Sequence, residues 1–168
     1  MVDGEAATEG RARIVSDQAA PAKPRYFEDF PVGAVFEFGS IAVTEPEIIA
    51  FARQFDPQTM HVDKVAAAKG PTGGLIASGW HTIAMMMRMY ADNILADNGL
   101  PAPGVDEVRW LQPVRPGDTL RMRVTIEAAR VSRSKPDRGV IRRYSEVLNQ
   151  HGEVVLTMRP INLVRRRP

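Results

Sequence analysis

One stretch, GWHTIAMMMRMYADNILAD at residues 79–97, constrains the fold of this chain more than any other. Its length and composition predict a helix, and Asn98 followed by Gly99 is a typical end for one. Trp, Ile, Ala and Met side chains are spread around it, so that almost no polar face is left. A helix that is apolar on all sides is expected to be buried. The rest of the chain must therefore supply a layer that covers it.

The segments around this helix predict strands. Residues 119–128, TLRMRVTIEA, alternate between apolar and polar side chains, which is typical of a strand with one buried face. Residues 139–149 and 153–164 predict two more strands joined by a short turn, and weaker candidates lie at 34–43 and 104–112. We therefore expect an α+β domain in which an antiparallel β-sheet wraps around one long central α-helix.

The length of 168 residues is enough for one domain with a substantial core and is short for two. Residues 1–24 are rich in Ala, Gly, Glu and Pro and predict a flexible N-terminal arm, which leaves 25–168 as a single domain. The chain has no cysteine, and its three histidines show no metal-ligand spacing, so we expect no metal site. No segment resembles a signal peptide or a membrane span, so we expect a cytoplasmic protein that does not bind membranes.

The segment FDPQTMHVD, residues 55–63, places two acids and a histidine in apolar surroundings. The preceding TEPE, residues 44–47, predicts the start of a helix. That helix must end at Asp56, because the residue before Pro57 is pushed out of the helical conformation. Taken alone, Asp56 would cap local backbone, and His61 would be a structural histidine bonded to a carbonyl.

This segment, together with LIASGWHT at residues 75–82, resembles the MaoC-like dehydratases, a hot-dog-fold family that includes the (R)-specific enoyl-CoA hydratases. In that family an Asp, four intervening residues and a His form the catalytic pair, and a Gly at the start of the central helix follows eighteen positions after the His. Asp56, His61 and Gly79 match this spacing. The resemblance covers about residues 25–165 and implies the hot-dog fold.

The resemblance implies reversible hydration of the C2–C3 double bond of an enoyl thioester, in the coenzyme A form, without a cofactor. Asp56 and His61 would move protons between water and substrate, with neither assigned as the acid or the base. The backbone N–H of Gly79 would stabilise negative charge on the thioester oxygen. A glycine that is required only for tight packing is the alternative.

Further contacts with an acyl-CoA substrate are expected at the side chains Ser78, Trp80, His81, Arg133, Lys135 and Arg138. An interior, hydrogen-bonded histidine would explain His81 equally well. The last three lie in the basic loop SRSKPDRG and could bind phosphates, or they could be solvated. Residues 113–168 hold 13 Lys and Arg against 5 Asp and Glu, but no nucleic-acid-binding motif accompanies them, so we expect no nucleic acid partner.

Two other functions stay open. A hot-dog thioesterase commonly takes its carboxylate from the central helix, and this helix has none before Asp92. A non-catalytic acyl-CoA-binding or partner subunit would keep the fold; the changed residues between Asp56 and His61 allow it, whereas the intact pair argues against it. Because hot-dog proteins with one unit pair into dimers, we expect a homodimer or a dimer of dimers.

Overall fold

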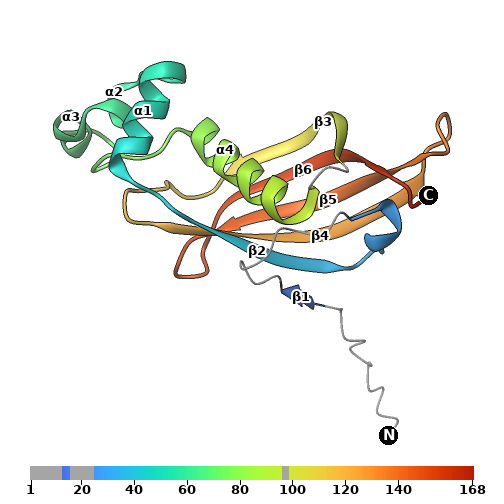
Figure 1. Ribbon diagram of the computed structural model, residues 1–168. Coiled ribbons are helices and arrows are strands. Elements are labelled where there is room, and N and C mark those ends of the chain that lie inside the picture. Colours follow the sequence, from blue (N-terminus) through green and yellow to red (C-terminus); the bar gives the residue numbers. More distant parts are fainter. Residues whose placement is uncertain (1–12, 16–24, 96–98) are drawn as a thin grey trace, which may run out of the picture.

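The computed structural model of this chain describes residues 13–15, 25–95 and 99–168 (Figure 1). Two expectations fall mostly or wholly outside the described residues. One is the N-terminal arm, of which only strand β1 (Arg13–Val15) is described. The other is the end of the long helix near Asn98.

Among the described residues, the sheet has six strands in the order β1-β2-β4-β5-β6-β3. The five long strands are β2 (Val35–Ala42), β3 (Gly99–Trp110), β4 (Thr119–Val131), β5 (Arg138–Leu148) and β6 (Val154–Arg165). Every neighbouring pair is antiparallel except β1 with β2, so the predicted antiparallel sheet is confirmed. Strand β3 begins at Gly99 rather than at residue 104, and an edge strand tolerates its two prolines.

Helix α4 (Gly79–Tyr90) lies across one face of this sheet and continues into a π-helical turn, η2 (Ala91–Leu95) (Figure 1). Its inward side chains pack against strand residues in one core, which includes Met86, Met89 and Tyr90 from α4 and Phe36, Phe38, Leu120, Met122, Val124, Ile126, Ile141 and Leu156 from the sheet. The expectation that this helix is buried on all sides is wrong for a single chain. Trp80 and Met87 are 61% and 42% exposed, because the sheet covers only one side of the helix.

A β-bulge brings strand β2 close to α4. The register between β2 and β4 shifts between Phe38 and Ile41, and Gly39 in this gap has a φ of +79°. A Cβ on Gly39 would lie 2.7 Å from Sδ of Met89. Glycine therefore serves two purposes here, because it adopts the left-handed conformation freely and leaves room for the helix.

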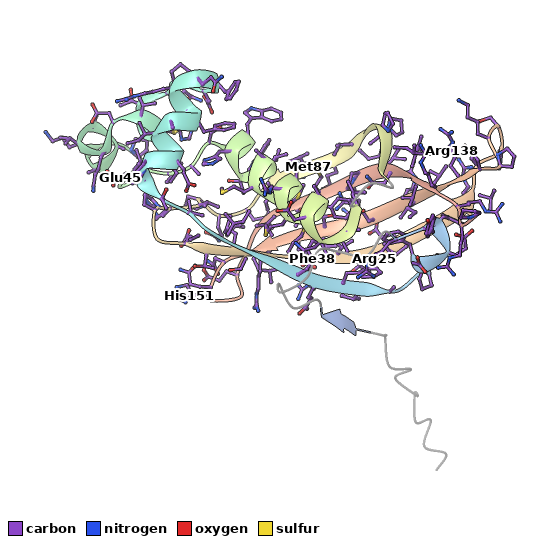
Figure 2. All side chains as sticks on the ribbon, viewed as in Figure 1. Arg25, Phe38, Glu45, Met87, Arg138 and His151 are labelled. Atoms are coloured by element: carbon purple, nitrogen blue, oxygen red, sulfur yellow. The ribbon has the colours of Figure 1, made fainter. Side chains whose placement is uncertain are left out.

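Three short helices gather beyond the N-terminal end of α4: α1 (Glu45–Phe55), α2 (Thr59–Val62) and α3 (Lys64–Lys69) (Figure 1). As predicted, Thr44 caps α1, since its side chain accepts a hydrogen bond from the N–H of Glu47 (3.4 Å), and α1 ends before Asp56. The predicted β4–β5 loop lies at the opposite end of the molecule, where Figure 2 shows Arg138 far from Glu45. Within the described residues, no helix has the length and apolar character that a membrane span needs.

Candidate active site

The carboxylate of Asp56 and the imidazole of His61 lie side by side where α1 gives way to α2. Asp56 Oδ2 is 3.5 Å from His61 Nε2, and the His61 side chain is almost completely buried. The first turn of α2 lies between them, and in it the N–H of His61 donates to the carbonyl of Gln58 (2.8 Å). The four intervening residues thus form a compact turn that brings the two side chains together.

The tautomer of His61 follows from its second ring nitrogen. His61 Nδ1 is 2.8 Å from the carbonyl oxygen of Ile76. A carbonyl can only accept a hydrogen bond, so Nδ1 carries the proton. In the neutral ring, Nε2 therefore presents its lone pair toward Asp56, and a water molecule beside these two acceptors, which are 3.5 Å apart, can donate a hydrogen bond to each. The histidine expected to bond a carbonyl does so, and its other nitrogen stays available.

Two other side chains donate to the Asp56 carboxylate. Nε2 of Gln58 donates to Oδ1 (2.7 Å), and the hydroxyl of Ser78 donates to Oδ2 (2.7 Å). The Gln58 bond, the Ser78 bond and the nearby His61 together hold the pKa of Asp56 below its usual value, against the opposing effect of partial burial. Asp56 is therefore poised as a carboxylate rather than as an acid.

Ser78 also connects this carboxylate to helix α4. It is the N-cap of α4 and fully buried, and its hydroxyl oxygen accepts a hydrogen bond from the N–H of Trp80 (3.2 Å). The same hydroxyl donates to Asp56, so Ser78 positions the carboxylate against the positive end of the helix. Ser78, which was expected to contact the substrate, is hydrogen-bonded to Asp56 and is not among the residues that line the cavity described below.

Both groups of the pair line a cavity of about 440 Å³ at the N-terminal end of α4. Its lining residues are Asp56, Gln58, Met60, His61, Ile76, Ala77, Gly79, Trp80, Thr82 and Trp110–Val114. Backbone hydrogen bonds join these segments: the N–H of Ile76 donates to Met60 O (3.1 Å), and the N–H of Ala77 to Val114 O (2.8 Å). The predicted residues Asp56, His61, Gly79 and Trp80 therefore share one cavity.

Gly79 opens α4 and faces this cavity. As the first helical residue, its N–H has no acceptor within the helix. A Cβ at this position would meet the indole of Trp110, with Nε1 at 2.4 Å. The two sequence interpretations of Gly79 are therefore compatible, because the same residue permits tight packing and leaves a backbone donor at the cavity.

His81 is absent from the cavity lining. Its ring stacks on Phe51 of α1, with centroids 4.7 Å apart and planes 10° from parallel. The side chain is buried, and among the described residues its Nδ1 has no hydrogen-bond partner. Burial lowers the pKa of His81, with a smaller opposing effect from Glu47. The structure therefore places His81 in the α1–α4 packing rather than at the cavity.

Arg133, Lys135 and Arg138 lie in the β4–β5 hairpin, at the end of the sheet far from α1 (Figure 2). Arg138 is engaged by Asp137 through two hydrogen bonds of 2.8 Å. Within one chain, these cations and the cavity are not brought together.

Sequence reasoning did not single out most of the cavity lining, and two of the residues that it missed, Gln58 and Trp110, matter for the site. In the sequence, Gln58 is notable only because it is one of the residues between Asp56 and His61 that differ from those common in the similar family. Trp110 lies at the end of β3, which corresponds to one of the two weaker strand predictions. One signal in the sequence was available. Trp110 is a large aromatic residue just before the segment LQPVRPGD, whose proline and glycine residues indicate that the strand ends there.

Comparison with known proteins gives a consistent result. The MaoC like domain family matches residues 29–147. The MaoC-like dehydratase of Rhodospirillum rubrum is 41% identical, with a TM-score of 0.80 over 86% of this chain and 99% of that one. The R-hydratase PhaJ1 of Pseudomonas aeruginosa shares the fold at 20% identity, with a TM-score of 0.73 over 88% and 90% of the two chains. Rv0216 of Mycobacterium tuberculosis, a double hot-dog fold, matches at 16% identity and a TM-score of 0.72 over 86% of this chain and 45% of that one. The predicted hot-dog fold is therefore confirmed.

Proposed function

Because this chain belongs to the MaoC like domain family, we propose that it catalyses the reversible hydration of an enoyl thioester, in the coenzyme A form, with Asp56 and His61 as the catalytic pair. The observation that carries this proposal is their geometry. Asp56 Oδ2 and His61 Nε2 are 3.5 Å apart on the wall of a cavity that ends at the first residue of α4.

The proton transfers follow from the tautomer of His61. A water molecule in the cavity, beside the two side chains, donates one hydrogen bond to Nε2 and another to the Asp56 carboxylate. As its oxygen attacks C3, Nε2 takes the proton, and Asp56 stabilises the imidazolium that forms. The same proton then passes from Nε2 to C2, so that one water is added and the pair returns to its starting state. Dehydration is the reverse sequence.

Negative charge develops on the thioester oxygen while C3 is attacked. The N–H of Gly79 and the positive end of the α4 dipole favour charge at this place. Ser78 fixes the carboxylate relative to the same helix end through its two hydrogen bonds. Proton transfer and charge stabilisation thus act from one rigid unit, which is the arrangement that hydration needs.

The similar proteins support this reaction class, since one is a MaoC-like dehydratase and another an R-hydratase. A thioesterase fits the structure less well. The first carboxylate along the helix, Asp92, lies in the η2 turn beyond the far end of α4, where it is paired with Arg88. A non-catalytic binding subunit would give no reason for the arrangement of Gln58, Ser78 and His61 around one carboxylate.

We further propose that this chain forms a homodimer, or an assembly of such dimers. Strand β1 covers the β2 edge, whereas β3 forms the other edge of the described sheet and is largely exposed. A long exposed edge invites pairing with another strand. Pairing of β3 with its own copy across a two-fold axis would be antiparallel, and would bring the far end of one chain toward the cavity of the other. Arg133 and Lys135 could bind carrier phosphates only in this way.

The direct test is an assay of hydration with purified protein. Crotonyl-CoA and longer enoyl-CoAs are supplied, and the loss of the conjugated absorbance is followed. We expect turnover in the wild type and a loss of about 10²-fold or more in kcat for Asp56→Asn and for His61→Ala, because each removes a proton-handling group. A parallel assay for released thiol would detect thioesterase activity, which contradicts the proposal if it is the only activity found.

A further inference from the structure

The two tryptophans of this chain both line the cavity that holds Asp56 and His61. Trp80 is 61% exposed and Trp110 is 48% exposed, although each has a large apolar surface. Exposed aromatic surface that is gathered at a cavity is typical of a place where a ligand packs. The arrangement of the two rings shows which of them has a fixed position.

Gly79 determines how Trp110 is seated. A Cβ on Gly79 would lie 2.4 Å from Nε1, 2.7 Å from Cε2 and 3.0 Å from Cδ1 of that indole. Such similar distances to three neighbouring ring atoms mean that the missing side chain would enter the face of the five-membered ring. The indole therefore lies flat on the glycine at the start of α4, and any other residue at position 79 would displace it.

Two further contacts fix the orientation of Trp110. Its ring meets that of Trp80 edge to face, with centroids 5.9 Å apart and planes at 73°. Its backbone is paired with Leu156 in β6, and the next N–H, that of Leu111, donates to Val155 O (2.8 Å). The sheet holds the main chain of Trp110 while α4 holds its ring. A wall that is fixed in this way can set the position of a ligand.

We propose that Trp110 is a specificity-determining residue: its indole, seated on Gly79, packs against the acyl-thioester segment of the substrate and positions it between the helix N-terminus and Asp56–His61. This inference rests on the proposed function for the identity of the ligand. The matching chemistry is a flat, conjugated acyl thioester. Such a group can lie along an aromatic face while its oxygen reaches the N–H of Gly79.

Because the Trp110 indole packs on Gly79, substitutions at these two positions can be combined in a double-mutant cycle that tests the contact. Gly79→Ala keeps the backbone N–H, so any loss in this variant comes from the added methyl group, which displaces the indole. In a Trp110→Ala background the methyl group has room. We therefore expect Trp110→Ala to lower kcat/KM for crotonyl-CoA by about 10- to 100-fold through misplacement of the acyl group. Gly79→Ala should cost about tenfold in the wild type but about twofold or less in the Trp110→Ala background.

Two controls accompany this cycle. Trp110→Phe keeps an aromatic wall and should recover most of the activity lost in Trp110→Ala. Val32→Ala trims an exposed apolar side chain outside the cavity and should match the wild type. Thermal melts establish that every variant is folded. Wild-type kinetics in Trp110→Ala would overturn the proposal. An equal cost of Gly79→Ala in both backgrounds would overturn the seating of the indole.

Binding is measured separately from turnover, so that failure of the proposed function can be recognised. Butyryl-CoA, which lacks the double bond, is titrated into Trp80→Phe protein, where Trp110 is the one remaining tryptophan. We expect its fluorescence to shift to shorter wavelength as the acyl group covers the indole. A wild type that binds butyryl-CoA without hydrating any enoyl-CoA would refute the reaction but not the contact. Binding seen by calorimetry without any change in Trp110 fluorescence would refute the contact.

Discussion

At the scale of single residues, the Asp56 carboxylate is defined by its donors. Gln58 donates a hydrogen bond to Oδ1, and Ser78 donates one to Oδ2. Oδ2 can accept a second hydrogen bond on the side that faces His61, where we place the water molecule. These bonds favour the charged form of Asp56 and hold its pKa below the ordinary value of 3.8. Gln58 lies in the segment whose sequence differs from the one common in the family. It therefore contributes to the charge state of the Asp56–His61 pair.

This contribution can be tested with Gln58→Leu. Loss of the strongest donor should raise the pKa of Asp56 toward its ordinary value, because the carboxylate is no longer favoured over the acid. The titration of the Asp56 carboxyl carbon, followed by NMR, measures this shift directly. Gln54→Leu changes an exposed glutamine on α1 and is the matched control. An unchanged Asp56 titration in Gln58→Leu would contradict this role for Gln58.

At the scale of elements, α1 and α4 are joined by the stack of Phe51 on His81. The stack buries an imidazole whose Nδ1 has no partner among the described residues, and Glu47 on α1 is the charged group that acts on it. Burial depresses the pKa of His81 below 6.5 in the folded chain. Between the folded and the unfolded pKa, the unfolded chain therefore binds more protons.

The contribution of His81 to stability is consequently lost as the pH falls. It is constant above the unfolded pKa of about 6.5, and it decreases below that value until the folded pKa is reached. His81→Phe keeps the stacked ring and removes the titration. Urea unfolding at about pH 7.5 and about pH 5.5 should show a smaller loss of stability in this variant than in the wild type. The same loss in both proteins would show that His81 does not titrate in this way.

The elements also show what the sequence can and cannot predict. Thr44 and Pro57 mark the ends of α1 because capping and proline geometry are local effects. The alternation in β4 is likewise local and was read correctly. The exposed stripe of α4 could not be predicted, because it depends on how much of the helix one sheet can cover. The pairing of Asp56 with His61 was expected only from the resemblance to a known family, because taken alone each residue predicts a local role. The contact of Trp110 with Gly79 depends on tertiary packing between residues distant in the sequence.

At the scale of the whole molecule, the cavity and the basic hairpin lie at opposite ends of one chain (Figure 2). A dimer through β3 would bring one chain's hairpin toward the other chain's cavity. Arg133→Glu with Lys135→Glu should then raise KM for enoyl-CoA, because two cations near the carrier phosphates are reversed. Size measurements in solution should first show a dimer.

Mixed dimers decide which chain supplies these cations. In one dimer, Asp56→Asn lies on one chain and the charge reversals lie on the other. The chain that keeps Asp56 then receives an unsubstituted hairpin from the chain that carries Asp56→Asn, and we expect a wild-type KM. In a second dimer, all substitutions lie on the same chain, and the KM of the remaining site should rise. The opposite pattern would show that each hairpin serves its own chain, and a constant KM would exclude the hairpin as a phosphate contact.

The central claim is that Asp56 and His61 act together on one water molecule in the cavity at the start of α4. It is tested most directly by kcat for enoyl-CoA hydration in Asp56→Asn, His61→Ala and the double variant. Because the two groups act as a unit, the double variant should lose little more activity than either single variant. Wild-type turnover in both single variants, in folded protein, would contradict the claim.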